Sequence, residues 1–202
     1  MKNAWTTYDE TQLKEVMSLS DDYMTFLSKG KTERKCVSLI LEEAKKHGYK
    51  DINEIIKNKE SLKPQDKVYM NMMNKSVALM HIGNRPIEEG MNILGAHIDS
   101  PRLDLKQNPL YEDGEIAYFD THYYGGVKKY QWVTIPLAIY GVVCFKRWID
   151  FEIEVGDKEE DPVFVISDHF GSSKCRSKCE KKASEVIEGE NLNVTVGSIP
   201  FK

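Results

Sequence analysis

The sequence predicts an α/β protein in which a portion containing helices is followed by an antiparallel β portion. Apolar residues recur every three to four positions in the first 50 residues, a pattern that indicates amphipathic helices. After Asp66, short apolar or alternating runs predominate, and these indicate strands. We place the boundary where the helical periodicity is lost, which gives two portions at residues 1–104 and 105–202.

Helical segments are expected at three places near the start of the chain. Residues 8–27 predict one bent helix or two short ones, because polar residues near the middle could start a new turn. A second amphipathic helix is expected from an N-cap at Thr32 to a stop at Gly48, with basic residues in its last turn. Residues 51–63 predict a short surface helix or turn that Pro64 closes.

Strands are expected from residue 67 onward. Extended runs at 67–73 and 76–82 flank a turn at Asn74-Lys75, which favours a hairpin. Residues 92–96 form a nearly continuous apolar run of the kind found inside a sheet. Further strands are predicted at 116–119, 130–145 with a break at Pro136, 151–155, 162–166 and 192–196.

Composition excludes several classes of protein. The 28 basic and 32 acidic residues give a net charge of −4, and 41% of the residues are hydrophobic, as in ordinary globular proteins. The charges are interspersed, so no one-sided basic field for nucleic acid is present. There is no run of about 18 apolar residues for a membrane helix, and the first residues lack an apolar signal core. We therefore expect a cytoplasmic chain with reduced cysteines and neither nucleic-acid nor membrane partners.

The most informative local feature is the segment 95–101 (GAHIDSP), where a predicted buried strand ends in a Ser-Pro turn. Ligands of open α/β sheets bind beyond the carboxyl ends of strands, and His97 and Asp99 would project to the same side there. The imidazole can bind a metal ion, and the carboxylate can accept its second N–H. His-x-Asp alone is a weak motif. The alternative is a buried, hydrogen-bonded histidine, with Asp99 capping the following turn.

The sequence around this segment resembles the M18 metalloaminopeptidases. Three stretches carry the resemblance: 85–93 (RPIEEGMNI), 97–106 (HIDSPRLDLK) and 121–132 (THYYGGVKKYQW). The similarity runs from the first helices to about Ile166 and resumes over 185–200. It is highly specific because it matches consecutive residues.

The resemblance implies a zinc-peptidase-like α/β domain portion followed by an inserted antiparallel β domain that mediates dimerisation. It implies a zinc-dependent aminopeptidase that hydrolyses N-terminal residues from peptides with a metal-activated water, using two zinc ions in the complete site. On this pattern His97 is implied to be a zinc ligand. Asp99 is implied to be the catalytic residue, as the carboxylate that orients His97. A homo-oligomer formed through the β domain is also implied.

The chain departs from the family pattern in its length. Family members are more than twice as long, and the catalytic glutamate and the remaining metal ligands are implied to follow Lys202. Both domain portions are therefore expected to be incomplete, zinc binding weak or absent, and the isolated chain inactive. The alternative is a non-catalytic truncated relative that acts as a self-association module, with Tyr130, Trp132 and Tyr140 as interface residues.

The resemblance breaks at residues 168–179 (DHFGSSKCRSKC). The family typically has a histidine here that reaches the neighbouring subunit's site, but Ser172 stands at about that place, and His169 precedes it by three residues. We therefore do not assign that role. Cys175 and Cys179 with His169 make at most half of a zinc site, and surface thiols are the favoured alternative.

Overall fold

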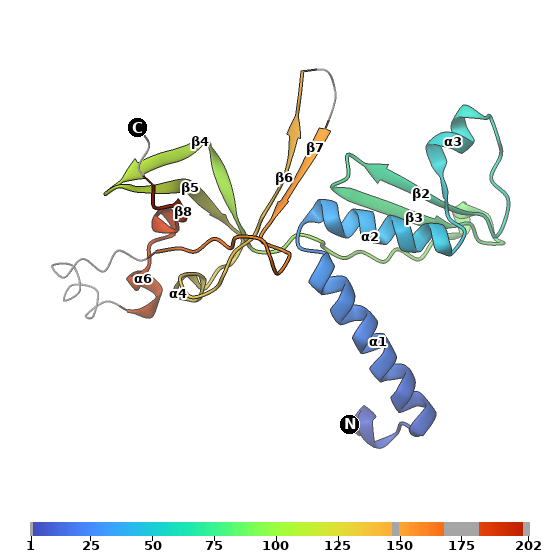
Figure 1. Ribbon diagram of the computed structural model, residues 1–202. Helices are drawn as coiled ribbons and strands as arrows, with labels where there is room; N and C mark the ends of the chain where they lie inside the picture. Colours follow the sequence, from blue (N-terminus) through green and yellow to red (C-terminus); the bar gives the residue numbers. More distant parts are fainter. Residues whose placement is uncertain (1, 147–149, 168–181, 200–202) are drawn as a thin grey trace. The chain divides into compact units, whose positions relative to one another are not determined.

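The chain divides into two compact units, at residues 1–100 and 101–202. The computed structural model describes residues 2–146, 150–167 and 182–199. The first unit combines helices with a small mixed sheet, and the strand pairs described in the second unit are antiparallel (Figure 1). The mixed α/β class predicted from the sequence is therefore found. No helix in these described ranges has the length and apolarity that crossing a bilayer requires.

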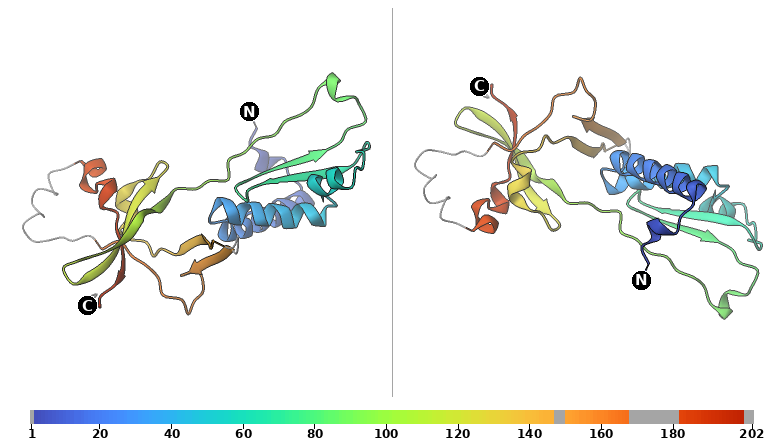
Figure 2. Two further views of the ribbon diagram at one scale, coloured as in Figure 1. Left: turned by 90° about the horizontal axis from the view of Figure 1, so that it is seen from above. Right: turned by 90° about the horizontal axis from the view of Figure 1, so that it is seen from below.

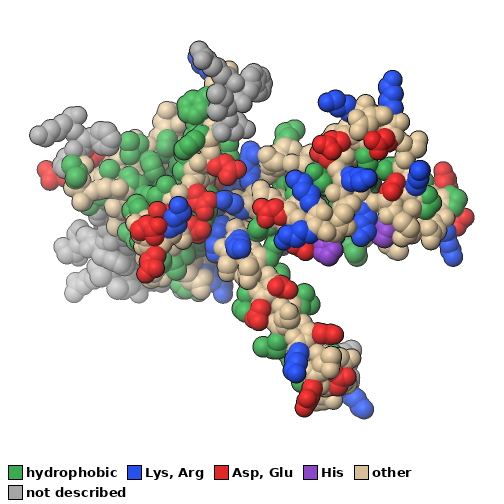
Figure 3. All heavy atoms as spheres, turned by 45° about the vertical axis from the view of Figure 1, so that its right-hand side comes forward, with side chains coloured by type: hydrophobic (Ala, Val, Ile, Leu, Met, Phe, Trp, Pro, Cys, Tyr) green, Lys and Arg blue, Asp and Glu red, His purple; other side chains and the backbone are tan. Residues whose placement is uncertain are grey.

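The first long helix, α1 (Glu10–Lys29), follows a 3₁₀ turn, η1 (Ala4–Thr6), and is continuous over 20 residues. The Asp9 carboxylate accepts a hydrogen bond from the Gln12 amide at 2.8 Å, and the Gln12 side chain accepts one from the Asp9 amide at 3.1 Å, which makes a capping box. Of the two forms left open by the sequence, the single helix is found. No residue of α1 is buried, and its apolar side chains share the surface with charged ones (Figure 3).

The next two helices lie where the sequence predicts them. The Thr32 hydroxyl caps α2 (Glu33–Lys46) by accepting a hydrogen bond from the first turn. The chain leaves α2 at Gly48, whose φ of +82° belongs to the left-handed region that glycine adopts readily. The Asp51 carboxylate caps the short helix α3 (Ile52–Lys57).

A three-stranded sheet completes the first unit. The strands β2 (Lys67–Met72) and β3 (Ser76–His81) form the predicted antiparallel hairpin, and β1 (Lys50–Asp51) pairs parallel with β2. Helices α2 and α3 both contact this sheet. The buried apolar side chains of this unit are Cys36, Val37, Ala44, Ile55, Val68 and Tyr69.

The buried strand predicted at residues 92–96 is not formed, so that prediction is wrong. After the 3₁₀ turn η2 (Ile87–Glu89) the chain runs extended to Pro101 (Figure 2). Residues 91–98 make no backbone hydrogen bond to any described residue. A strand requires a neighbour that accepts its N–H groups and donates to its carbonyls, and the described part of the chain supplies none here.

The second unit contains a three-stranded sheet in the order β4–β5–β8 and a separate β6–β7 hairpin. The bounds are β4 (Arg102–Asp113), β5 (Ile116–Tyr124), β6 (Ile139–Cys144), β7 (Asp150–Val155) and β8 (Val194–Gly197). The strands expected near 116, 151 and 192 are thus present with shifted ends. Strand β4 is not among the strands predicted from the sequence, and it contains Pro109, which lacks an amide hydrogen. A register shift between Leu105 and Leu110 accommodates it.

Two further predictions for the second unit are wrong. The start of the strand expected at 130–145 is instead a short helix, α4 (Lys129–Trp132), which directs Trp132 against the unit's own core. Residues 162–166 make isolated bridges at Phe164 and Val165 and no continuous strand. Near the end of the chain lie α6 (Ala183–Val186) and η3 (Gly189–Asn191). The main buried apolar cluster of this unit comprises Ile166, Ile187, Leu192 and Val194.

Candidate metal-binding site

His97 and Asp99 lie in contact on the extended stretch that follows η2. Nδ1 of His97 is 3.1 Å from the carbonyl oxygen of Asp99 and 3.3 Å from its carboxylate oxygen Oδ1. Side chains two positions apart in an extended chain point to the same side, which brings the two groups together as the sequence predicts. The tautomer protonated on Nδ1 donates to these oxygens, and its Nε2 then carries the lone pair that a metal ion accepts.

The surroundings of this pair differ from the expectation. The side chain of His97 is 86% exposed and that of Asp99 is 42% exposed. This exposure contradicts the alternative of a buried, packed histidine. It also differs from the expected crevice at a strand end, because the strand is not formed and no described residue encloses the imidazole.

The donor set around the pair is small. Among the described residues, no group of three or more His, Cys, Asp or Glu side chains is arranged so that it could hold a metal ion. A closed zinc site requires about four ligands. The described residues therefore provide a candidate for one ligand position, His97, and a carboxylate that orients it, Asp99. They do not make a complete site. His169, Ser172, Cys175 and Cys179 lie outside the described residues.

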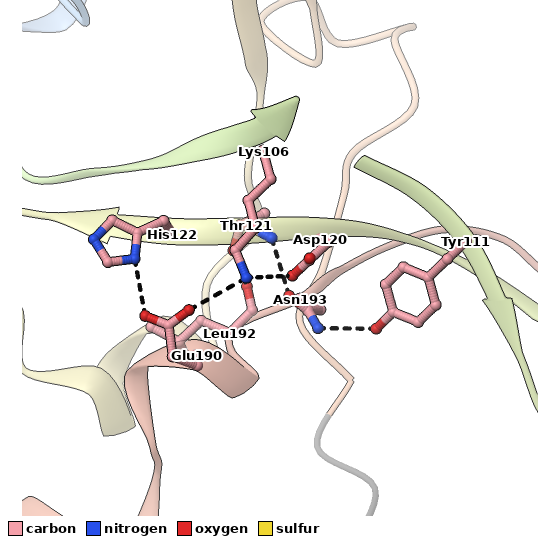
Figure 4. A network of polar contacts seen from close by, with 8 residues as sticks. All are labelled: Lys106, Tyr111, Asp120, Thr121, His122, Glu190, Leu192 and Asn193. Atoms are coloured by element: carbon pink, nitrogen blue, oxygen red, sulfur yellow. Dashed lines mark hydrogen bonds and ion pairs between the residues drawn. The ribbon is translucent and has the colours of Figure 1, made fainter. Parts of the chain in front are cut away.

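A second polar cluster joins β4 and β5 to η3 (Figure 4). Nζ of Lys106 lies 3.0 Å from Oδ1 of Asp120 and 3.2 Å from Oε2 of Glu190. Nδ1 of His122 lies 2.8 Å from Oε1 of Glu190. Sequence reasoning missed this cluster, because Glu190 is 68 residues from His122. The only signal in the sequence was that Asp120 and His122 alternate on one side of a strand.

This cluster is an ion-pair network. Hydrogen bonding to Asp120, and then to Glu190, raises the pKa of Lys106. Hydrogen bonding from Lys106, and then from His122, lowers the pKa of Glu190. The ammonium group of Lys106 thus contacts both carboxylates.

Neutral hydrogen bonds extend the network into the interior. The side chain of Thr121 is fully buried, and its hydroxyl donates to the carbonyl of Leu192 at 2.6 Å. The Thr121 amide donates to Oδ1 of Asn193 at 3.0 Å, and Nδ2 of Asn193 donates to the Tyr111 hydroxyl at 2.9 Å. These bonds fasten the segment after η3 to β5 and β4, so the second cluster is a structural connection within the unit.

Comparison with known proteins identifies the family of the chain. The family of aminopeptidase I zinc metalloproteases (M18) matches residues 26–195. The chain belongs to the M18 family. The matched range contains His97 and Asp99 as well as the network around Glu190. A probable M18 family aminopeptidase 1 of Clostridium acetobutylicum is 53% identical over 204 residues, which cover 100% of this chain and 43% of that protein.

Solved M18 structures have a similar fold. The M18 aminopeptidase of Thermotoga maritima superposes with a TM-score of 0.84 at 40% identity, over 99% of this chain and 42% of its own. Aminopeptidase I of Borrelia burgdorferi gives a TM-score of 0.82 at 40% identity, over 100% of this chain and 44% of its own. The chain thus spans less than half the length of these M18 relatives.

Proposed function

We propose that the chain is a portion of a zinc-dependent aminopeptidase that hydrolyses N-terminal residues from peptides. The observation that carries this proposal is the match of residues 26–195 to the M18 zinc metalloproteases, which includes the contact between His97 and Asp99. The similarity of the fold to M18 structures supports it. A cytoplasmic location, expected from the sequence, belongs to the same proposal, and cell fractionation would test it.

His97 and Asp99 have separate roles in this proposal. Nε2 of His97 binds one of two zinc ions, while Asp99 holds the ring in the tautomer and orientation that present this nitrogen. Bound zinc would polarise the scissile carbonyl and lower the pKa of a water molecule. Asp99 is thus a positioning residue that acts through the imidazole.

The domain assignment is also part of the proposal. Residues 1–104 would be a portion of the α/β peptidase domain, and residues 105–202 a portion of the β domain through which subunits associate. The exposed side chain of Tyr130 suits such an interface. Trp132 does not, because it packs against the core of its own unit.

The decisive experiment uses a chimera in which this chain replaces the matched 43% of the Clostridium acetobutylicum relative. With zinc and aminoacyl nitroanilides, the chimera is expected to release nitroaniline, and the 202-residue chain alone is expected to be inactive. The chimera carrying His97→Ala is the control for the site. A folded chimera without turnover would overturn the proposed activity. Robust turnover by the isolated chain would show that further ligands are not required.

A non-catalytic self-association module is the second candidate, and the β6–β7 hairpin favours it. Val143 and Phe151 are cross-strand partners, and the two residues are 39% and 62% exposed. A two-stranded hairpin is marginally stable alone, so an apolar face of this kind favours a covering partner. Light scattering should then give at least twice the mass of one chain. A compact monomer at high concentration would count against this candidate.

A further inference from the structure

We propose that helix α1 is a self-association surface, on which the α1 of a second copy of this chain packs antiparallel about a two-fold axis near Ser20. The inference concerns the first unit and is independent of the proposed peptidase activity. It also differs from the candidate interface on the β6–β7 hairpin, which belongs to the second unit.

Helix α1 is long but largely uncovered. It spans 20 residues, and the described part of the chain buries none of them. Helix α2 is its main neighbour among the described elements. Helices in proteins gain most of their stability by burying an amphipathic face. A helix of this length without a buried residue therefore favours a partner that covers it.

One face of α1 carries an apolar stripe. At the helical spacing of about 100° per residue, six apolar side chains and Ser20 fall within an arc of about 120°. We call these six residues the α1 stripe: Leu13, Val16, Met17, Tyr23, Met24 and Leu27. Leu13 and Val16 are partly buried, and the other four are 50–60% exposed. The stripe is thus an apolar surface that a partner can cover.

The α1 stripe is symmetric about Ser20. Its residues lie three, four and seven positions before Ser20 and three, four and seven positions after it. A two-fold axis at Ser20 therefore places Leu13 opposite Leu27 of the second copy, and Met17 opposite its Tyr23. The small side chain of Ser20 lets the two helices approach closely where they cross. The stripe is in this way complementary to its own copy.

The charges at the two ends of α1 favour the antiparallel orientation. Asp9 and Glu10 stand at the start of the helix, whereas Lys29 and Lys31 stand at its other end. In an antiparallel pair, each acidic end lies beside the basic end of the other copy, while a parallel pair would bring like charges together. The antiparallel pair also places opposite ends of the two helix dipoles side by side. This charge complementarity, together with the symmetry of the stripe, identifies the occupant as a second copy of this chain.

Two methionines of the stripe report directly on its cover. Hydrogen peroxide converts accessible methionines to sulfoxides, and mass spectrometry measures the rate at each site. In the 202-residue chain, oxidation of Met17 and Met24 should slow by about fivefold as rising concentration makes most of the chain dimeric. Met73 is the control, because it is 89% exposed in the turn between β2 and β3, and its rate should not change.

Matched glutamate substitutions locate the interface on the helix. Met24→Glu places a charge within the paired stripe and should raise the dissociation constant of the dimer, measured by sedimentation equilibrium, by about tenfold or more. Leu19→Glu is the control, because Leu19 is an apolar residue of the same helix that is 69% exposed and lies outside the arc of the stripe. Its substitution should change the constant by less than about twofold. Circular dichroism checks that both variants keep their helix content.

Charge reversal tests the antiparallel orientation. Glu10→Lys and Lys31→Glu should each raise the dissociation constant by about threefold, because each places like charges side by side across the interface. The double variant restores opposite charges at these positions, so its constant should return toward that of the unsubstituted chain. A double variant without this recovery would overturn the antiparallel arrangement.

Three outcomes would overturn the inference. The first is a chain that stays monomeric, with Met17 and Met24 equally reactive at all concentrations. The second is a dimer that Phe151→Lys dissociates and Met24→Glu leaves intact, which would place the interface on the β6–β7 hairpin. The third is protection of Met17 and Met24 that is absent from the chain alone and independent of concentration in the chimera with the Clostridium acetobutylicum relative. That result would identify the remainder of the M18 fold as the occupant of the stripe.

Discussion

One residue, Asp99, offers two acceptors to Nδ1 of His97: its carbonyl oxygen at 3.1 Å and its carboxylate at 3.3 Å. The carbonyl contact does not depend on the charge of the side chain. The ring therefore keeps one hydrogen-bond acceptor when the carboxylate is replaced by a neutral group.

Substitutions of this pair in the active chimera should have unequal effects. His97→Ala removes the ligand and should lower zinc per subunit, measured by mass spectrometry of the dialysed protein. Asp99→Asn keeps the carbonyl acceptor, so zinc should remain while activity falls, on the order of 10–100-fold. Equal loss of zinc in both variants would show that the carboxylate itself is needed to retain the metal.

The buried hydroxyl of Thr121 should contribute measurably to the stability of the second unit. Thr121→Val leaves the Leu192 carbonyl without its 2.6 Å donor, which should lower the free energy of unfolding by about 1–3 kcal/mol. The control is Thr134→Val, because the Thr134 hydroxyl donates to Gln131 at the surface, where water replaces it. Urea denaturation followed by circular dichroism measures both. Equal midpoints for the two variants would contradict the prediction.

The ion pairs of Glu190 predict a pH dependence. The pKa of Glu190 is lowered by hydrogen bonding from Lys106 and then from His122, so the folded state favours the carboxylate. This contribution to stability is present above the ordinary pKa of 4.5 and is lost as the pH falls through the lowered native value. Glu190→Gln should flatten the decline in stability at acidic pH, whereas Glu185→Gln, at a glutamate outside the network, should leave it unchanged. Urea midpoints measured from pH 6 to pH 3 would decide.

Local signals explain which elements the sequence predicts. The helix that follows Thr32 has a cap, an amphipathic stripe and a glycine stop, all within 17 residues, and the structure reproduces each of them. The hairpin around Asn74 is equally local. Its turn residues Met73 and Asn74 both have positive φ, as tight hairpin turns require.

The errors arise where structure depends on distant residues. The run at 92–96 has the composition of a buried strand, but composition does not supply the neighbour that a strand requires. The segment at 129–132 has strand-forming residues, yet it is helical and packs Trp132 on a core formed by residues 34 or more positions later. The contact between His122 and Glu190 crosses 68 residues and leaves no local pattern. At the candidate metal site, the contact of His97 with Asp99 was predictable because it is local. The exposure of the imidazole was not predictable, because it depends on residues that are distant in the sequence.

Gly189 should be intolerant of even a methyl group. It is buried at the start of η3, and a Cβ built on it would overlap the ring of Tyr123. Gly189→Ala should therefore lower the free energy of unfolding by about 1–3 kcal/mol, because either the ring or the 3₁₀ turn must move. Movement of that turn would also displace Glu190 from Lys106, so the acid sensitivity described above should weaken in the same variant.

A matched substitution and a compensating one make this prediction specific. Gly141 lies in β6 with nothing within 4 Å of its added Cβ, so Gly141→Ala should be neutral or stabilising. Combining Gly189→Ala with Tyr123→Leu removes the overlapping ring, and the double variant should be more stable than the sum of the single effects predicts. Urea denaturation of the four proteins gives this coupling directly. Strict additivity would mean that the cost at Gly189 does not come from the ring of Tyr123.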